Sequence, residues 1–212
     1  MRKYTIMIIA VLAGLIALGD DLESQQRWYE KERITGDLMG LRPAMEDAGL
    51  TPFAYYNAIV AANVSGGVES EQDYASDVYF GMKFDLEKLL GWKDTVFTVS
   101  GIDRHGNTIA PEVGSYYDPM QLVGGQTTFL YQMHVEKTFD DNLAVKVGRM
   151  GAQDDFGVSP FYGYSVNNVL NGTIRANLMD GVMTVYPYAT WGARVKYNKS
   201  ENQVFQIGVY HH

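Results

Sequence analysis

The sequence predicts an all-β fold, a transmembrane antiparallel β-barrel, from three observations. Apolar and polar residues alternate in about seven segments that follow residue 51. Charged side chains occupy the polar positions of these segments, and aromatic side chains lie near the segment ends. Short turns and long connections separate the segments, as they do in membrane-spanning barrels.

The composition agrees with this fold and excludes other classes of protein. The 212 residues include 22 glycines and 15 tyrosines, which suits β-structure. A mean hydropathy of -0.17 argues against a bundle of membrane helices. A net charge of -8 argues against nucleic-acid binding, which needs a basic surface. The chain has no cysteine, so it forms no disulfides and cannot be lipidated at an N-terminal cysteine.

The N-terminus has the layout of a secretory signal peptide. Arg2 and Lys3 precede an apolar run at residues 6–18, which is too short to span a bilayer. Ala17-Leu18-Gly19 has the small-x-small spacing of a cleavage site, so residues 1–19 are expected to be removed. A buried N-terminal helix and an uncleaved anchor are the alternatives.

The rest of the chain divides into two regions by pattern. Residues 20–50 form an N-terminal periplasmic segment, in which residues 22–33 are compatible with a helix. Residues 44–49 predict one helical turn that ends at Gly49. Residues 51–212 are expected to form part of a β-barrel.

The predicted strands show a period of two, which places successive side chains on opposite faces. In residues 191–198 the apolar face holds Trp191 and Tyr197 and the polar face holds Arg194. Residues 78–86, 143–150 and 205–210 show the same alternation, whereas residues 53–64 and 96–104 show it less clearly. In residues 129–137 the pattern assigns Phe129, Tyr131, Met133 and Val135 to the apolar face, and Gln132, His134 and Glu136 to the polar face.

A soluble β-sandwich has the same alternation, so two further features favour the membrane. Aromatic residues near strand ends suit the girdles at membrane interfaces, and these residues are Tyr79, Trp92, Trp191 and Tyr197. The polar faces also hold more charge than a dry interior tolerates. The connections at residues 106–126 and 151–190 are long, and long loops in compact domains usually have a function.

Several motifs, in order, resemble those of the carbohydrate-selective porin (OprB) family. Residues 34–49 resemble its opening segment, although Leu38-Met39 stands near where the family often has tryptophan. The sequence Asn63-Val64-Ser65-Gly66-Gly67 resembles its first loop, and residues 85–92 resemble its first periplasmic turn. Arg104-His105-Gly106 resembles a strand exit. Residues 130–159, with Val147-Gly148-Arg149 and Asp154-Asp155-Phe156, resemble the following hairpin and loop.

This resemblance implies a 16-stranded porin barrel in the bacterial outer membrane, of which this chain would be about the N-terminal half. It implies passive, selective diffusion of sugars, loops folded inward to narrow the pore, no catalysis and no cofactor. Outer-membrane lipid and the barrel-assembly machinery would be its partners, and monomer or homo-oligomer stays open. The chain stops within a predicted strand, which suggests a truncated member, and the final His211-His212 pair is not expected to bind metal.

Sugar recognition in such a pore would use charged, hydrogen-bonding and aromatic side chains. The candidates on the polar strand faces and in the long loop are Lys83, Arg104, His134, Glu136, Arg149, Asp154, Asp155, Tyr162, Tyr164 and Arg194. Arg104 and Arg149 are favoured among them, because both stand where a strand enters a long loop.

Other functions have weaker support in the sequence. The first alternative is a soluble periplasmic β-sandwich that binds a ligand. A glycan hydrolase with paired carboxylates is a further alternative, and His134 and Glu136 share a strand face as an acid–base pair would. No nucleophile elbow, zinc motif or phosphate loop is evident. Asp140-Asp141 and Asp154-Asp155 could hold calcium, but such pairs more often form turns.

Overall fold

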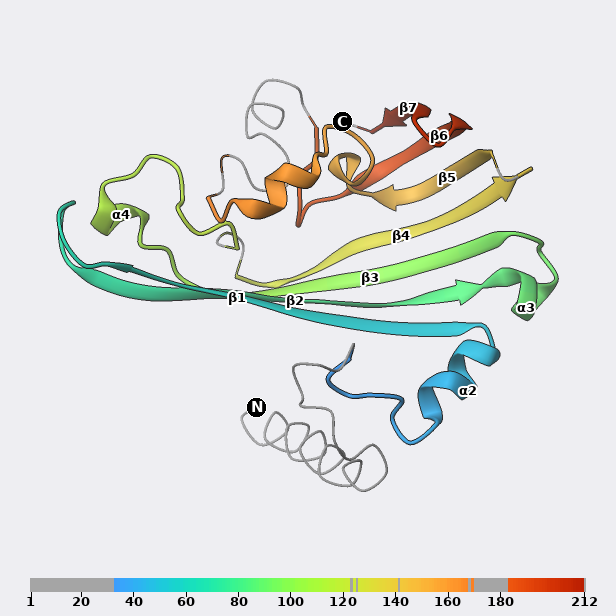
Figure 1. The fold of residues 1–212 in the computed structure, drawn as a ribbon, viewed down its shortest axis with the longest axis horizontal. Helices are drawn as coiled ribbons and strands as arrows, with labels where there is room; N and C mark the ends of the chain where they lie inside the picture. Colours follow the sequence, from blue (N-terminus) through green and yellow to red (C-terminus); the bar gives the residue numbers. More distant parts are fainter. Residues whose placement is uncertain are drawn as a thin grey trace. The chain divides into compact units, whose positions relative to one another are not determined.

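The computed structural model describes residues 33–122, 124, 126–140, 142–167, 169 and 183–211. The expected signal peptide and most of the helix-compatible stretch, residues 22–32, lie outside the described residues. Two compact units can be distinguished, with the division between Thr51 and Pro52. Figure 1 follows the chain from the first of these units through the strands of the second.

The first unit contains helix α2, Leu41–Asp47. Gly40, with φ of 83°, precedes the helix, and the Arg42 side chain donates to the carbonyl of Gly36 at 3.2 Å. The helix ends where the N–H groups of Ala48 and Gly49 bond back to the last turn, and Gly49 has φ of 86°. The sequence predicted this turn and its glycine stop, but the helix begins earlier than expected, at Leu41.

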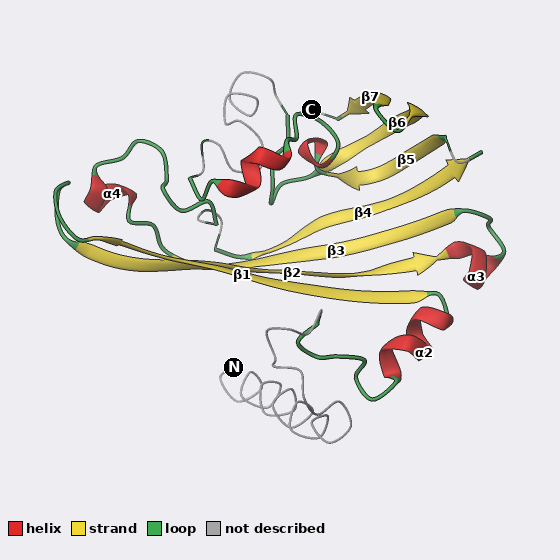
Figure 2. Ribbon diagram, in the orientation of Figure 1, coloured by secondary structure: helices red, strands yellow, loops and turns green. Residues whose placement is uncertain are grey.

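The second unit is built on a seven-stranded sheet whose strands follow one another in chain order. Its strands are β1 Leu50–Asn63, β2 Glu71–Asp85, β3 Thr95–Gly106, β4 Thr128–Phe139, β5 Leu143–Met150, β6 Thr190–Ser200 and β7 Gln203–Tyr210 (Figure 2). Each neighbouring pair from β2 to β7 is antiparallel. The predicted fold class is confirmed, including the two segments with unclear alternation.

Short turns gather at one end of the sheet and long connections at the other. Helix α3, Leu86–Leu90, joins β2 to β3, and the Asp85 side chain caps it by accepting the N–H groups of Glu87 and Lys88. At the other end, helix α4, Ala110–Val113, belongs to the β3–β4 connection. Figure 2 shows α3 and α4 at opposite ends. The β5–β6 connection contains the 3₁₀ turns Ala152–Asp154 and Pro160–Tyr164.

The two faces of the sheet differ in chemistry, and strand register assigns residues to them. Asp77 lies opposite Arg104, and Lys146 lies opposite Arg194. We call the face with these residues the inner face. The other, outer face presents large apolar side chains to the surroundings. These are Tyr56, Val60, Phe80, Leu130, Val147, Trp191, Val195, Tyr197, Phe205, Ile207 and Val209, each at least 37% exposed.

An apolar face of this extent is unfavourable in water, since each Å² of apolar surface left in water costs about 25 cal/mol. Soluble proteins rarely expose so large a continuous patch. The outer face therefore suits contact with the hydrocarbon of a bilayer. No helix in the described ranges is long and apolar enough to span a membrane.

A β-bulge changes the faces of β4 from those that the sequence predicted. The pairing shifts between Val99 and Gly101, so that Tyr131 and Gln132 of β4 face the single residue Ser100 of β3. The expectation that Phe129 and Tyr131 share the apolar face with Met133 and Val135 is therefore wrong. Phe129 pairs with the inner-face residue Ile102, and Tyr131 is 2% exposed.

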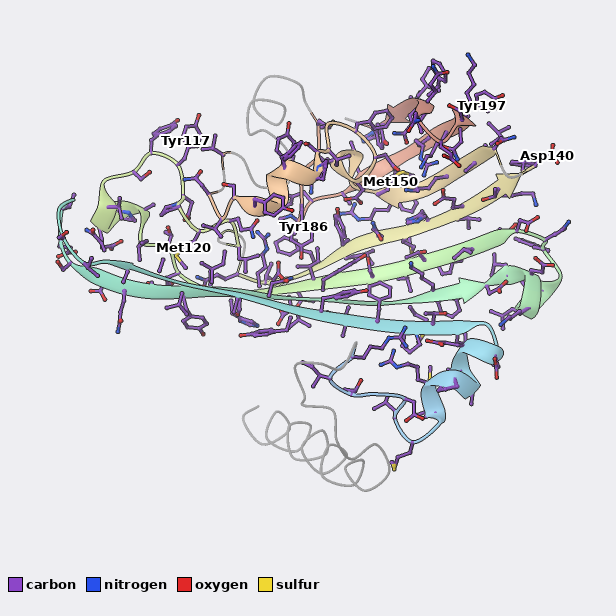
Figure 3. The ribbon with its side chains drawn as sticks, viewed as in Figure 1. Tyr117, Met120, Asp140, Met150, Tyr186 and Tyr197 are labelled. Atoms are coloured by element: carbon purple, nitrogen blue, oxygen red, sulfur yellow. The ribbon has the colours of Figure 1, made fainter. Side chains whose placement is uncertain are left out.

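The long connections pack onto the inner face and bury small apolar clusters there. Ala75 of β2 packs with Ile109, Met120 and Leu122. Ile102, Tyr131 and Ala189 form a second cluster, with Tyr79 and Tyr186 against it. Figure 3 shows Met120 and Tyr186 on the same side of the sheet. Tyr79 was predicted to belong to an interfacial girdle, but the register places it on the inner face, opposite Ile102.

Candidate functional site

The first polar cluster of the inner face is centred on Asp77, which is 1% exposed. Its carboxylate accepts hydrogen bonds from the Asn57 amide and the Tyr186 hydroxyl, both at 2.8 Å. The Arg104 Nε lies 3.7 Å from the same carboxylate. Three strands and the β5–β6 connection thus meet at one buried acidic side chain.

Arg104 also contacts residues of the long connections. Its guanidinium lies 4.9 Å from the centre of the Tyr186 ring, a cation–π distance. Its Nη1 donates to the carbonyl of Gly124 at 3.2 Å. Burial raises the pKa of Tyr186 well above its usual value, and the nearby Asp77 charge acts in the same direction. Tyr186 therefore stays protonated and remains a donor to Asp77.

The second cluster is a row of charged residues across three adjacent strands. Glu136 of β4 lies opposite Lys146 of β5, which lies opposite Arg194 of β6. The Arg194 Nη2 is 2.9 Å from Glu136, and the Lys146 Nζ is 3.9 Å from it. Residues directly opposite each other in an antiparallel sheet point to the same face, so all three side chains lie on the inner face. We call these three residues the wall row.

The β5–β6 connection places an acidic side chain beside this wall row. Asp155 lies 2.9 Å from the Lys146 Nζ and 3.2 Å from the Arg194 Nη2. The side chain of Arg194 is 3% exposed, and those of Lys146 and Asp155 are each 10% exposed. Both cations and Asp155 are therefore buried, Glu136 beside them is 33% exposed, and the four side chains together have no net charge.

The neighbouring Asp154 binds different partners. The Tyr131 hydroxyl donates to one of its oxygens, and the Gln132 amide donates to the other at 2.8 Å. Both donors stand at the bulge of β4. Burial raises the pKa of Asp154, although these two hydrogen bonds lower it in part. The two aspartates point to separate partners, and the described residues contain no group of three or more metal-binding side chains.

Aromatic side chains extend from the clusters along the inner face. The ring of Tyr79 lies 5.1 Å from Phe53, 6.1 Å from Tyr55 and 6.0 Å from Tyr131, centre to centre. The Tyr131 ring lies 5.3 Å from that of Tyr186. Flat ring faces beside hydrogen-bonding groups suit a solute with both apolar C–H faces and hydroxyls.

The structure brings together six of the ten residues that the sequence nominated. Five of them lie in or beside the wall row or its acidic connection, namely His134, Glu136, Asp154, Asp155 and Arg194, and Arg104 lies in the Asp77 cluster. His134 is 7% exposed on the inner face, and no described residue partners its Nδ1.

The other four nominated residues lie apart from the clusters. Lys83 is exposed on the inner face opposite Thr98, nearer the α3 end. Tyr162 and Tyr164 lie in the second 3₁₀ turn, where Tyr164 is 89% exposed. Arg149 lies on the same face as Val147, the outer face, and its Nε donates to the carbonyl of Leu130 at 3.1 Å.

Sequence reasoning missed Asp77, Lys146 and Tyr186 as members of the site. Lys146 occupied a polar strand position, and only its pairing with Glu136 and Arg194 distinguishes it from a solvated lysine. Asp77 lies in the part of β2 before residue 78, which the sequence did not assign to a strand. Tyr186 comes from an irregular segment, whose contacts no periodicity reveals.

Comparison with protein families gives one match, which covers two thirds of the chain. Residues 70–212 match the model described as "Carbohydrate-selective porin, OprB family". The putative porin QuiX of Acinetobacter baylyi is 30% identical over 220 residues, covering 98% of this chain and 48% of that protein. Porin B of Pseudomonas aeruginosa is 29% identical over 208 residues, covering 93% of this chain and 45% of that protein.

Solved structures of Pseudomonas putida OprB have a similar fold. The high-pH structure gives a TM-score of 0.77 at 30% identity, covering 84% of this chain and 44% of that one. The low-pH structure gives a TM-score of 0.59 at 26% identity, with 85% and 50% covered. The chain thus spans about half the length of the relatives and structures that it matches.

Proposed function

This chain belongs to the carbohydrate-selective porin (OprB) family, and we propose that it forms part of the wall of an outer-membrane pore through which sugars diffuse passively. The observation that supports this most is the division of the sheet into two faces. The outer face exposes Trp191, Ile207 and other apolar side chains, whereas the inner face holds ion pairs such as Lys146 with Asp155. A barrel wall between lipid and an aqueous pore needs this division.

The lining of the inner face suits uncharged, hydroxylated solutes. Each inner-face cation of the two clusters stands beside a carboxylate, as Arg104 does beside Asp77, so no strong field of one sign faces the solute. Amide, hydroxyl and carboxylate groups can exchange hydrogen bonds with sugar hydroxyls. The proposed path contains Lys83, Arg104, His134, Glu136 and Arg194, with Asp154, Asp155, Tyr162 and Tyr164 from the connection. Arg149 is left out, because it lies on the outer face.

The proposal includes an export route and a location. A signal peptide at residues 1–19 would take the chain to the periplasm, and the barrel-assembly machinery would insert it into outer-membrane lipid. The exposed apolar residues of the outer face support this location, since they would otherwise remain in water. The alternative of a soluble β-sandwich needs a second layer to cover the same residues.

Two measurements on the full chain test the proposal. Fractionation of expressing cells should place the protein in the outer membrane, from which only detergent extracts it. Liposomes that contain the purified protein should swell faster in glucose than protein-free liposomes do. Recovery of a folded protein in the detergent-free periplasmic fraction, or swelling no faster than in protein-free liposomes, would contradict the proposal.

A further inference from the structure

Two consecutive residues of the β5–β6 connection together contact four strands of the inner face. Asp154 binds Tyr131 and Gln132 of β4, and the Asp155 side chain binds Lys146 of β5 and Arg194 of β6. The Asp155 carbonyl accepts the amide of Gln206 from β7 at 3.0 Å.

The contacts continue on both sides of this pair. The ring of Phe156 lies edge-on to that of Tyr210 in β7, with centres 6.2 Å apart. The N–H of Ala152 donates to the Thr184 hydroxyl at 3.0 Å, and the N–H of Gln153 donates to the Thr184 carbonyl at 3.2 Å. Residues 151–156 are thus fixed both to the sheet and to the end of the connection that enters β6.

The wall row requires the acidic residue that the connection supplies. Glu136, Lys146 and Arg194 together have one negative and two positive charges, so the row alone has an excess positive charge. Asp155 balances it within hydrogen-bonding distance of both cations. Because Lys146, Arg194 and Asp155 are largely buried, separation of Asp155 would leave a buried charge without its partner, which is strongly unfavourable.

The two aspartates differ in what they contribute to this attachment. Asp154 accepts hydrogen bonds from two neutral donors, and an asparagine can keep part of that interaction. Asp155 binds two cations, and an asparagine has no charge with which to balance them. The attachment therefore depends more strongly on the charge of Asp155 than on that of Asp154.

We propose that Asp155 is a positioning residue that holds residues 151–156 against the inner face at the wall row, and that this placement sets the largest solute that passes. The second half of the inference rests on the proposed function; the first half does not. When the segment is held, it occupies space beside β5 to β7. When Asp155 is neutral, the segment detaches more often and the path widens.

Thiol labelling tests the attachment without any need for transport. The chain has no cysteine, so Ala152→Cys provides a single thiol at a position that is 3% exposed. We expect a membrane-impermeant maleimide to label it slowly in the otherwise unchanged protein in detergent. Addition of Asp155→Asn should raise the labelling rate about tenfold, because charge-assisted bonds to two cations are lost. Asp154→Asn is the matched control and should raise the rate less than about threefold.

Folding of each variant is checked by the β-sheet circular dichroism of the detergent-solubilised protein. If Asp155→Asn does not fold, Lys146→Met removes one of its two partners and should raise labelling by the same mechanism. In a Lys146→Met background the wall row is already neutral, so adding Asp155→Asn should have a smaller effect than it has alone. If Asp155→Asn left the labelling rate unchanged, the attachment would be overturned. Where Lys146→Met is used instead, an unchanged labelling rate would overturn it in the same way.

The size limit is tested by liposome swelling with glucose and the trisaccharide raffinose. Asp155→Asn should raise the ratio of the raffinose rate to the glucose rate, and it should raise this ratio more than Asp154→Asn does. An unchanged ratio in Asp155→Asn would contradict the size-limiting role. Faster labelling without sugar flux in any variant would support the attachment while contradicting the proposed function, so the two failures are distinguishable.

Discussion

Buried charged residues of the inner face depend on partners from other segments, and Asp77 is the clearest example. It is 1% exposed and receives two hydrogen bonds and the Arg104 charge. Strand alternation can place such a residue on a polar face, but it cannot show which residues from other segments reach it. The sequence therefore nominated Arg104 and missed its partner.

Removal of the Asp77 carboxylate should destabilise the protein substantially. Asp77→Ala leaves Arg104 buried without a counter-charge, which costs about 3–5 kcal/mol. Asn57→Ala removes one hydrogen bond to the same carboxylate and should cost about 1 kcal/mol. The free energy of unfolding of the detergent-solubilised protein in urea measures both. Similar losses of stability for the two variants would show that burial of the Arg104 charge does not require Asp77.

The titration of Asp154 should contribute to the free energy of unfolding, and this contribution should decrease as pH rises. Burial raises the pKa of its carboxyl above the unfolded value, so the folded state binds a proton more tightly than the unfolded state does. This contribution is fully present below the ordinary carboxyl pKa and is lost as pH rises through the raised pKa. Asp154→Asn removes the titration. The stability of Asp154→Asn relative to the unchanged protein should therefore increase between pH 4 and pH 8, as thermal unfolding measures; a decrease would contradict the assigned direction.

Among the elements, the strands could be predicted from the sequence and the bulge could not. Apolar and polar residues alternate with a period of two in most of the strands, and this pattern indicated about seven strands and their connections. A bulge adds one residue to a strand, but the amino-acid composition of the strand does not reveal it. The bulge in β4 reversed the predicted faces of Phe129 and Tyr131. The long connections lack periodicity altogether, so the contact of Asp155 with Lys146 and Arg194 was not foreseen.

A substitution of Gly148 in β5 tests how closely β4 and β5 approach each other at the site. Gly148 has φ of 142°, and a Cβ there would lie 2.4 Å from the Met133 carbonyl oxygen and 2.6 Å from the His134 Cα. Gly148→Ala should therefore cost about 1–3 kcal/mol of stability. Gly163→Ala is the matched control, because a Cβ at Gly163 meets nothing within 4 Å. Urea unfolding should show a change within about 0.5 kcal/mol for this control; an equal loss at both positions would contradict the close approach at Gly148.

At the scale of the whole sheet, one face is apolar and exposed while the other is polar and covered by connections. This arrangement is the reverse of a soluble sandwich, in which the apolar face is the covered one. Alternation in the sequence predicted two unlike faces, and the amount of charge on the polar positions indicated which face meets water. The structure adds that the charges of the described inner face are arranged in compensated groups, as in the wall row with Asp155.

The contact of the outer face with hydrocarbon is the central claim, and quenching of Trp191 by brominated lipid tests it most directly. Trp191 is 53% exposed on the outer face, and Trp28→Phe with Trp92→Phe leaves it as the single tryptophan. In reconstituted vesicles, lipids brominated on the acyl chain should strongly quench its fluorescence, and aqueous acrylamide should quench it weakly. Weak quenching by the lipid together with strong quenching by acrylamide would place the outer face in water and contradict the account.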